Sequence, residues 1–144
     1  MNAPDNVETE NRNADTREPK QKPFGFDWEG ARPEGVESVR LFGGRGSVWV
    51  WDLLAGKQAS PFSAVLNCEL AAGGSVGAHV QQRDPEILVG LEGEGVATVD
   101  GVSHALAPGR VVYLKLGGVL AIENPSPLPL RYLIIKSQTA PSRP

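Results

Sequence analysis

The 144-residue chain has little of what metal clusters, disulfides and membrane spans require. It contains one cysteine and two histidines, and it has no apolar run of about 18 residues. One cysteine excludes an intramolecular disulfide and a structural zinc cluster, so we expect Cys68, in the apolar stretch AVLNCEL, to be a small core residue. The first twenty residues also lack the apolar centre of a signal peptide. We therefore expect a cytoplasmic protein without a membrane partner.

The chain also lacks an excess of basic residues. Its formal net charge is -3 and its isoelectric point is near 5.4. Proteins that bind a phosphate backbone need a basic stripe or patch. Nucleic acid is therefore not an expected partner.

Turn-forming residues are abundant, and helical periodicity is absent. The 17 glycines and 12 prolines are combined with short stretches of alternating apolar and polar residues. This pattern indicates an all-β sandwich or barrel in one domain. Strands are expected at 36–41, 46–54, 61–70, 76–81, 86–92, 95–100, 102–106, 110–115, 118–124 and 129–136.

The two ends of the chain differ from the centre in composition. Residues 1–22 are polar and charged, with few aliphatic side chains, and cannot bury enough surface to offset their ordering entropy. We predict a disordered N-terminal tail at 1–22, a β-barrel domain at 36–136 and a disordered C-terminal tail at 137–144.

Two local patterns inside the domain are specific. In strand 46–54, Trp49 and Trp51 fall on one face, and we expect them to fill the barrel or to face a partner subunit. Asp100-Gly101 is a two-residue hairpin signal.

The stretch GGSVGAHVQQRDPEILVGLEGEG carries the most information about function. Gly73, His79, Glu86 and Gly93 stand at spacings that resemble the first motif of the cupin family, which also has a second His two residues after the first. Gln81 stands at the position of that second His.

A second stretch resembles the second cupin motif and departs from it further. Gly109, Gly117 and Asn124 match the family pattern. Lys115 replaces its Pro, and Leu120 replaces the His that normally completes the metal site.

The resemblance covers roughly residues 40–136 and implies a cupin-type double-stranded β-helix, or jelly-roll barrel. It also implies a homodimer, since many small cupins dimerise. His79 and Gln81 would share one face of a strand, and Glu86 would reach them from the next strand. We expect the pocket to be lined by His79, Gln81, Glu86 and Leu120.

The resemblance leaves the cofactor open. A typical cupin metal has three His ligands and one carboxylate, whereas this chain offers His79, Gln81 and Glu86. That set does not meet the usual needs of non-haem iron or catalytic zinc. One alternative is no cofactor, and the other is a divalent ion (Mn, Fe, Zn or Ni, or a weak oxygen-preferring site for Mg) held by these three residues.

Without a metal, the same residues form a polar cluster in an apolar cup, as in many small-molecule sites. Glu86 is then the candidate proton-transfer group and His79 its partner, with Gln81 as a neutral orienting residue. Such a site suits isomerase or cyclase chemistry.

Three other residues are weaker candidates. His104 shares the face of Leu106, where a core role is more common than ligation. Lys115 is expected to be a solvated surface lysine, and the face of Arg131 is ambiguous.

Three functions remain open at this stage. The first is a small-molecule-binding cupin, with or without metal-free proton transfer. The second is a divalent-metal-dependent cupin enzyme. The third is a structural or dimerisation barrel without a ligand, so whether the protein is an enzyme is undecided.

Overall fold

Ten strands and one short 3-10 turn make up the part of the chain that the computed structural model describes, residues 34–139. In chain order they are β2 (Gly35–Val39), η2 (Leu41–Gly43), β3 (Ser47–Asp52), β4 (Phe62–Leu70), β5 (Ser75–Val80), β6 (Glu86–Glu92), β7 (Gly95–Val99), β8 (Val102–Leu106), β9 (Val111–Leu114), β10 (Val119–Glu123) and β11 (Leu130–Ser137).

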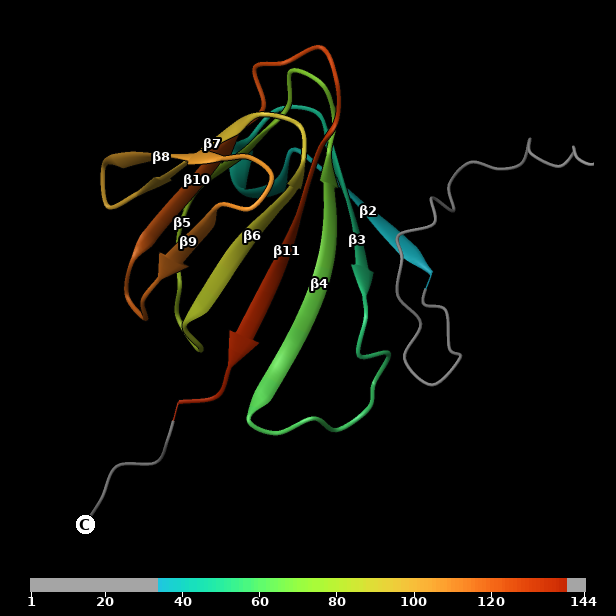
Figure 1. The fold of residues 1–144 in the computed structure, drawn as a ribbon, viewed down its shortest axis with the longest axis vertical. Coiled ribbons are helices and arrows are strands. Elements are labelled where there is room, and N and C mark those ends of the chain that lie inside the picture. The colour runs from blue at the N-terminus through green and yellow to red at the C-terminus, as the bar shows by residue number, and fades with distance from the viewer. Residues whose placement is uncertain (1–33, 140–144) are drawn as a thin grey trace, which may run out of the picture.

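The strands form two antiparallel sheets (Figure 1). One sheet has the order β5-β10-β7-β8, and the other has the order β2-β3-β4-β11-β6-β9. The last strand, β11, lies between β4 and β6, as Figure 1 shows. The prediction of an all-β jelly-roll barrel is confirmed.

The predicted hairpin turn has the expected backbone. Asp100 and Gly101 both have positive φ, 49° and 83°, and Val99 pairs with Val102 across them. These values suit a two-residue hairpin turn whose twist matches that of the strands. The turn at Gly93 instead carries the chain from β6 in the large sheet to β7 in the small one.

Alternation along the strands sends one set of side chains between the sheets. The buried core is apolar and is built from every strand except the edge strand β2. Its members are Val48, Cys68, Leu70, Val76, Leu88, Ala97, Leu106, Val112, Leu114, Leu120, Ile122, Leu130 and Tyr132. The inner face of β4 and β11 therefore alternates as expected for a half-buried strand.

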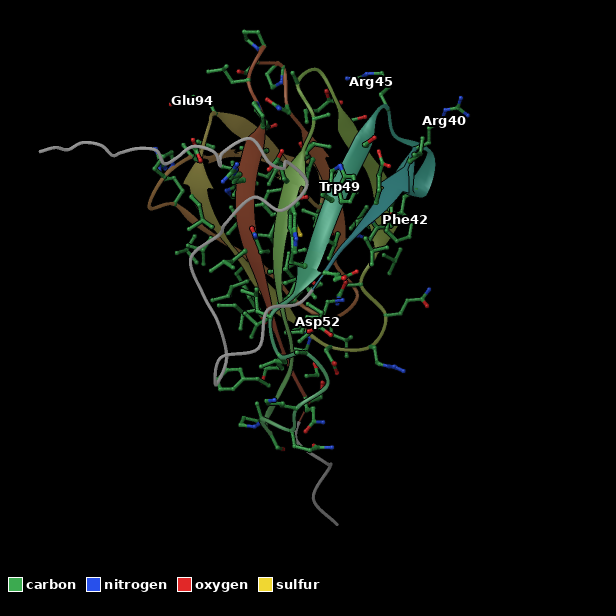
Figure 2. All side chains as sticks on the ribbon, turned by 90° about the vertical axis from the view of Figure 1, so that its right-hand side faces the viewer. Arg40, Phe42, Arg45, Trp49, Asp52 and Glu94 are labelled. Carbon is green, nitrogen blue, oxygen red and sulfur yellow. The ribbon has the colours of Figure 1, made fainter. Side chains whose placement is uncertain are left out.

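The tryptophans of β3 do not fill the barrel. Val48 and Val50 line the internal cavity, so Trp49 and Trp51 project from the opposite face of the sheet. Their ring centroids are 6.2 Å apart, and Figure 2 marks Trp49 on β3. The predicted alternation is right, but the interior face carries the smaller valines.

The C-terminal strand runs one residue beyond the predicted range and ends at Ser137. The backbone N–H of Gln138 then donates a hydrogen bond to the carbonyl oxygen of Pro61. The predicted tail at 1–22, and residues 140–144 of the predicted C-terminal tail, lie outside the described residues. Between residues 34 and 139, no helix is long and apolar enough to cross a membrane.

Asn124 clamps the chain where β10 leaves the small sheet. Its side chain is fully buried, and its Nδ2 group lies 3.2, 3.0 and 2.8 Å from the carbonyl oxygens of Leu70, Ala71 and Leu128. Its Oδ1 accepts a hydrogen bond from the backbone N–H of Ser126. The motif residue thus joins three segments by hydrogen bonds.

Replacing this side chain should destabilise the fold. Asn124→Ala leaves buried carbonyls without a donor, which we expect to cost about 1–3 kcal/mol of unfolding free energy. Asn124→Asp should be at least as damaging at neutral pH, because it places a carboxylate against carbonyl oxygens. Urea unfolding measures the stability of both variants. A midpoint within error of that of the parent protein would contradict a stabilising role for the Asn124 hydrogen bonds.

Candidate functional site

A cavity of about 760 Å³ lies between the two sheets. It is lined by Leu41, Phe42, Val48, Val50, Ser63, Ala64, Leu66, Cys68, Val76, His79, Val80, Gln81, Gln82, Arg83, Asp84, Glu86, Leu120, Ile122, Tyr132, Ile134 and Lys136. The structure therefore brings His79, Gln81, Glu86 and Leu120, the four residues expected in the pocket, to one cavity.

His79 belongs to β5 and pairs in register with Leu120 of β10. Its Nδ1 lies 2.9 Å from the carbonyl oxygen of Gly77, which can only accept, so Nδ1 carries the proton. In the neutral ring, Nε2 therefore has the free lone pair. That nitrogen can accept a proton or bind a ligand donor.

The ring of Phe42 covers one face of His79. The two ring centroids are 3.9 Å apart and the planes are 12° from parallel. Phe42 lies in η2 with a positive φ of 52°, beside Gly77, where a Cβ atom would collide with the Phe42 carbonyl oxygen. Glycine at position 77 thus allows η2 to lie directly on β5 and hold the imidazole in place.

Gln81 follows the end of β5 and is buried. Its backbone exchanges hydrogen bonds with the loop before β10, at Gly117 and Gly118. Its Nε2 donates to the backbone carbonyl of Asp84, so the amide group closes the 81–84 loop. The amide oxygen remains available as a neutral acceptor.

Glu86 begins β6, and its side chain is only 3% exposed. It pairs in register with Lys136 of β11, and its Oε1 lies 3.6 Å from Lys136 Nζ. Burial raises the pKa of the Glu86 carboxyl, while the charge of Lys136 opposes part of that rise. Glu86 is thus a buried carboxyl with one cation beside it.

Lys136 is the residue that the sequence reasoning did not single out. In LRYLIIKS it follows Tyr132 and Ile134 at spacings of two, so it shares the inward face of β11. The sequence does carry a signal for Lys136: it is a charged residue at the next position of an inward-facing apolar series.

Cys68 and Tyr132 form the floor of the cavity, two rows of side chains inward from Glu86. They pair in register across β4 and β11, and both are buried. Burial raises the pKa of the Cys68 thiol to about 12, with a further contribution from Glu86, and burial raises the pKa of Tyr132 as well. Both groups stay protonated at neutral pH, and Cys68 is the buried core residue that we expected.

Polar and apolar walls occupy different levels of the cavity. The register places Ala64, Lys136 and Glu86 in one row across β4, β11 and β6. The next row inward is apolar, with Leu66, Ile134 and Leu88. The exposed residues Gln82 and Arg83 belong to the lining near the first row, so the cavity reaches solvent at its polar end.

The donors do not fit a usual cupin metal. Leu120 replaces a nitrogen ligand with a buried apolar group, the Gln81 amide is tied to the loop, and Glu86 lies beside a cation. Among residues 34–139, no group of three or more His, Cys, Asp or Glu side chains could hold a metal ion. The residues described thus offer fewer donors than iron or zinc sites require.

The weaker candidates lie away from the cavity lining. His104 is exposed on β8, so it is not a core residue, and Lys115 is exposed in the turn after β9. Arg131 projects from the outer face of the large sheet, where it lies 3.2 Å from Glu69 and 3.5 Å from Glu92. Arg131 therefore has a structural ion-pair role at that face.

Comparison with protein families gives a match to the Cupin domain over residues 66–136. Dimethylsulfoniopropionate lyase DddW of Ruegeria pomeroyi is 36% identical over 84 residues. The match covers 55% of this chain, and the chain spans about half (55%) of the length of that relative.

Solved structures give the same fold. A predicted oxalate decarboxylase from Thermotoga maritima superimposes with a TM-score of 0.69 at 26% identity, over 74% of this chain and 94% of the other. A cupin 2 conserved barrel domain protein from Salinispora arenicola has a TM-score of 0.56 at 24% identity, over 71% and 82% of the two chains. A sugar phosphate isomerase from Silicibacter pomeroyi has a TM-score of 0.54 at 20% identity, over 64% and 60%, and this similarity bears on the fold alone.

The pairing of Glu86 with Lys136 predicts pH-dependent stability. Lys136→Met leaves the buried carboxylate unpaired, which we expect to cost about 1–3 kcal/mol at pH 8. The raised pKa means that the folded protein binds the Glu86 proton more tightly than the unfolded chain does. The cost should therefore shrink as the pH falls, because the folded protein takes up the Glu86 proton more readily than the unfolded chain does.

A double-mutant cycle with Glu86→Gln isolates this pair. In the Glu86→Gln background, Lys136→Met should cost less at pH 8 and should lose its pH dependence. Chemical denaturation at pH 5 and pH 8 measures all four proteins. Equal costs in both backgrounds would show that the two charges do not interact.

Proposed function

Since this chain belongs to the cupin superfamily, we propose that its interior pocket binds a small organic molecule and that Glu86 transfers a proton to or from it. The observation that carries the proposal is the Glu86 carboxyl, which is 3% exposed in the wall of a cavity of about 760 Å³. Cavities of roughly 300–1,000 Å³ accommodate small ligands. A buried carboxyl facing such a space is suited to general acid or base catalysis.

The environment of Glu86 supports this role. A carboxyl with an ordinary pKa is a weak base at neutral pH, and burial strengthens it by disfavouring the ionised form. Lys136 acts in the opposite direction and keeps ionised Glu86 accessible. The net effect is a Glu86 pKa above that of an exposed glutamate, which makes its carboxylate a stronger base.

His79 supplies a second proton-transfer site on the opposite sheet. Its Nδ1–H donates to the Gly77 carbonyl, which leaves Nε2 as the reactive atom. Phe42 stacks on the ring and fixes its orientation. We assign to His79 the proton exchange complementary to that of Glu86, and to Gln81 an orienting hydrogen bond through its amide oxygen.

The similarity to Dimethylsulfoniopropionate lyase DddW supports proton-transfer chemistry. Elimination of a leaving group from a propionate requires removal of a C–H proton by a base. Isomerisation and cyclisation use the same elementary step. We infer from this relative only the proton-transfer step, and not the substrate.

Exchange of carbon-bound hydrogen with solvent tests this function without knowledge of the full reaction. A set of small organic acids, keto acids and sugars is incubated with the protein in D₂O, and exchange is followed by proton NMR. We expect exchange with at least one compound, and a loss of about 10²–10⁴-fold in Glu86→Gln, the usual contribution of a general base.

Glu92→Gln is the matched control for this substitution. Glu92 lies on the same strand with a side chain 69% exposed, and it pairs with Arg131 outside the cavity. Its variant should retain full exchange activity. Undiminished exchange in Glu86→Gln would eliminate the assigned role.

The proposal also predicts behaviour toward metals. Because the donors do not fit a usual cupin metal, the purified protein should hold no stoichiometric Mn, Fe, Zn or Ni, and chelation should leave its melting temperature unchanged. Elemental analysis and thermal unfolding with EDTA measure this. Near-stoichiometric metal that disappears in Glu86→Ala would favour the divalent-metal enzyme, with His79, Gln81 and Glu86 as ligands.

A further inference from the structure

We propose that the pocket selects an organic anion of the carboxylate class with an apolar body, and that Lys136 is the residue that recognises its charge. The inference names the ligand class for the site described above, so it rests on the proposed function. Lys136 acts here as a specificity-determining residue, while Glu86 remains the proton-transfer group.

Lys136 has hydrogen-bonding capacity left for a ligand. Its Nζ lies 3.6 Å from Glu86 Oε1, longer than a typical N–H···O hydrogen bond of about 2.7–3.2 Å. An ammonium group has three N–H donors, and a single carboxylate at this distance does not satisfy them. The side chain is 32% exposed, so the charge is partly desolvated and can still be reached from solvent.

The other charged residues of the lining are less suited to this role. Arg83 is exposed in the loop between β5 and β6, where water screens its charge. The Asp84 carboxylate accepts a 2.7 Å hydrogen bond from the Ser63 hydroxyl at the edge of the cavity. Lys136 is therefore the best-placed cation among the described lining residues.

Glu86 can make room for a second negative charge. Its raised pKa means that protonation of the folded protein is comparatively easy. When a carboxylate approaches Lys136, Glu86 can take up a proton and leave the ammonium to the ligand; Glu86 is then the proton donor of the complex, and His79 Nε2 is the acceptor. The pocket thereby avoids two buried anions beside one cation.

The apolar wall deeper in the cavity determines the chemistry of the ligand beyond its carboxylate. The row beyond Lys136 holds Leu66 and Ile134, and the facing sheet adds Leu120 and Ile122 to the lining. Hydroxyl groups placed against this wall would lose hydrogen bonds to water without replacement. A ligand with an apolar body and a terminal carboxylate fits the two levels of the cavity, whereas a sugar does not.

Matched pairs of acids and amides provide the test. Hexanoate and 3-phenylpropanoate are titrated into the 144-residue protein by calorimetry, beside hexanamide and 3-phenylpropanamide. Each acid should bind at least about tenfold more tightly than its amide, the order expected for a hydrogen bond to a charged group. Amides that bind as tightly as the acids, or no binding by any of the four, would overturn the inference.

Variants assign the preference to Lys136. Lys136→Met should reduce acid affinity to the level of the amide, and Lys136→Arg should keep the order acid over amide. Lys115→Met, which removes an exposed lysine outside the lining, should change neither affinity. If folded Lys136→Met kept the acid preference, another residue would recognise the carboxylate.

Glu86→Gln separates this inference from the proposed function. Removal of the competing carboxylate should raise acid affinity, while it lowers hydrogen exchange by about 10²–10⁴-fold. Acid selectivity without any exchange activity in the parent protein would retain the ligand class and reject proton transfer. Exchange activity combined with equal binding of acids and amides would retain proton transfer and reject the ligand class.

Discussion

The position of the last strand determines most of the chemistry of this molecule. β11 pairs with β4 on one side and with β6 on the other, so the end of the domain is inserted between two strands of the middle. The register of this insertion sets Lys136 opposite Glu86 and Tyr132 opposite Cys68. A shift of one residue would turn these side chains to the outer face, where neither pair could serve a cavity.

The Glu86–Lys136 pair also allows the altered cupin motif to be interpreted in physical terms. In a typical cupin the carboxylate of the first motif lies beside a metal cation. Here Gln81 and Leu120 replace two nitrogen ligands, and an ammonium group lies 3.6 Å from the carboxylate. An ammonium group belongs to the chain and does not depend on metal supply, but it cannot act as a Lewis acid. In this structure the charge of Lys136 opposes part of the rise in the pKa of Glu86.

Local patterns predicted much of the fold. Alternating apolar residues and turn signals gave the strands, because side-chain period and turn geometry act over a few residues, as at Asp100-Gly101. Motif spacing also predicted that His79 and Glu86 lie close together, and both line the cavity. Lys136 could not be assigned in this way, because its neighbour Glu86 is fifty residues away and only the long-range register joins them. The alternative that placed the tryptophans inside the barrel was wrong for a related reason: alternation separates two faces but does not say which one is inside.

The contact between Gly77 and Phe42 has a consequence for anyone who would redesign the protein. No side chain can be added at position 77 without moving η2, and moving η2 would release the ring that rests on His79. Substitutions at this wall are therefore not tolerated. The loop from Gln82 to Asp84, exposed for most of its length and joined to the barrel by few side-chain bonds, can accept new residues or added length. Attempts to enlarge the binding site or change its preference should begin at this loop, at the polar rim of the barrel.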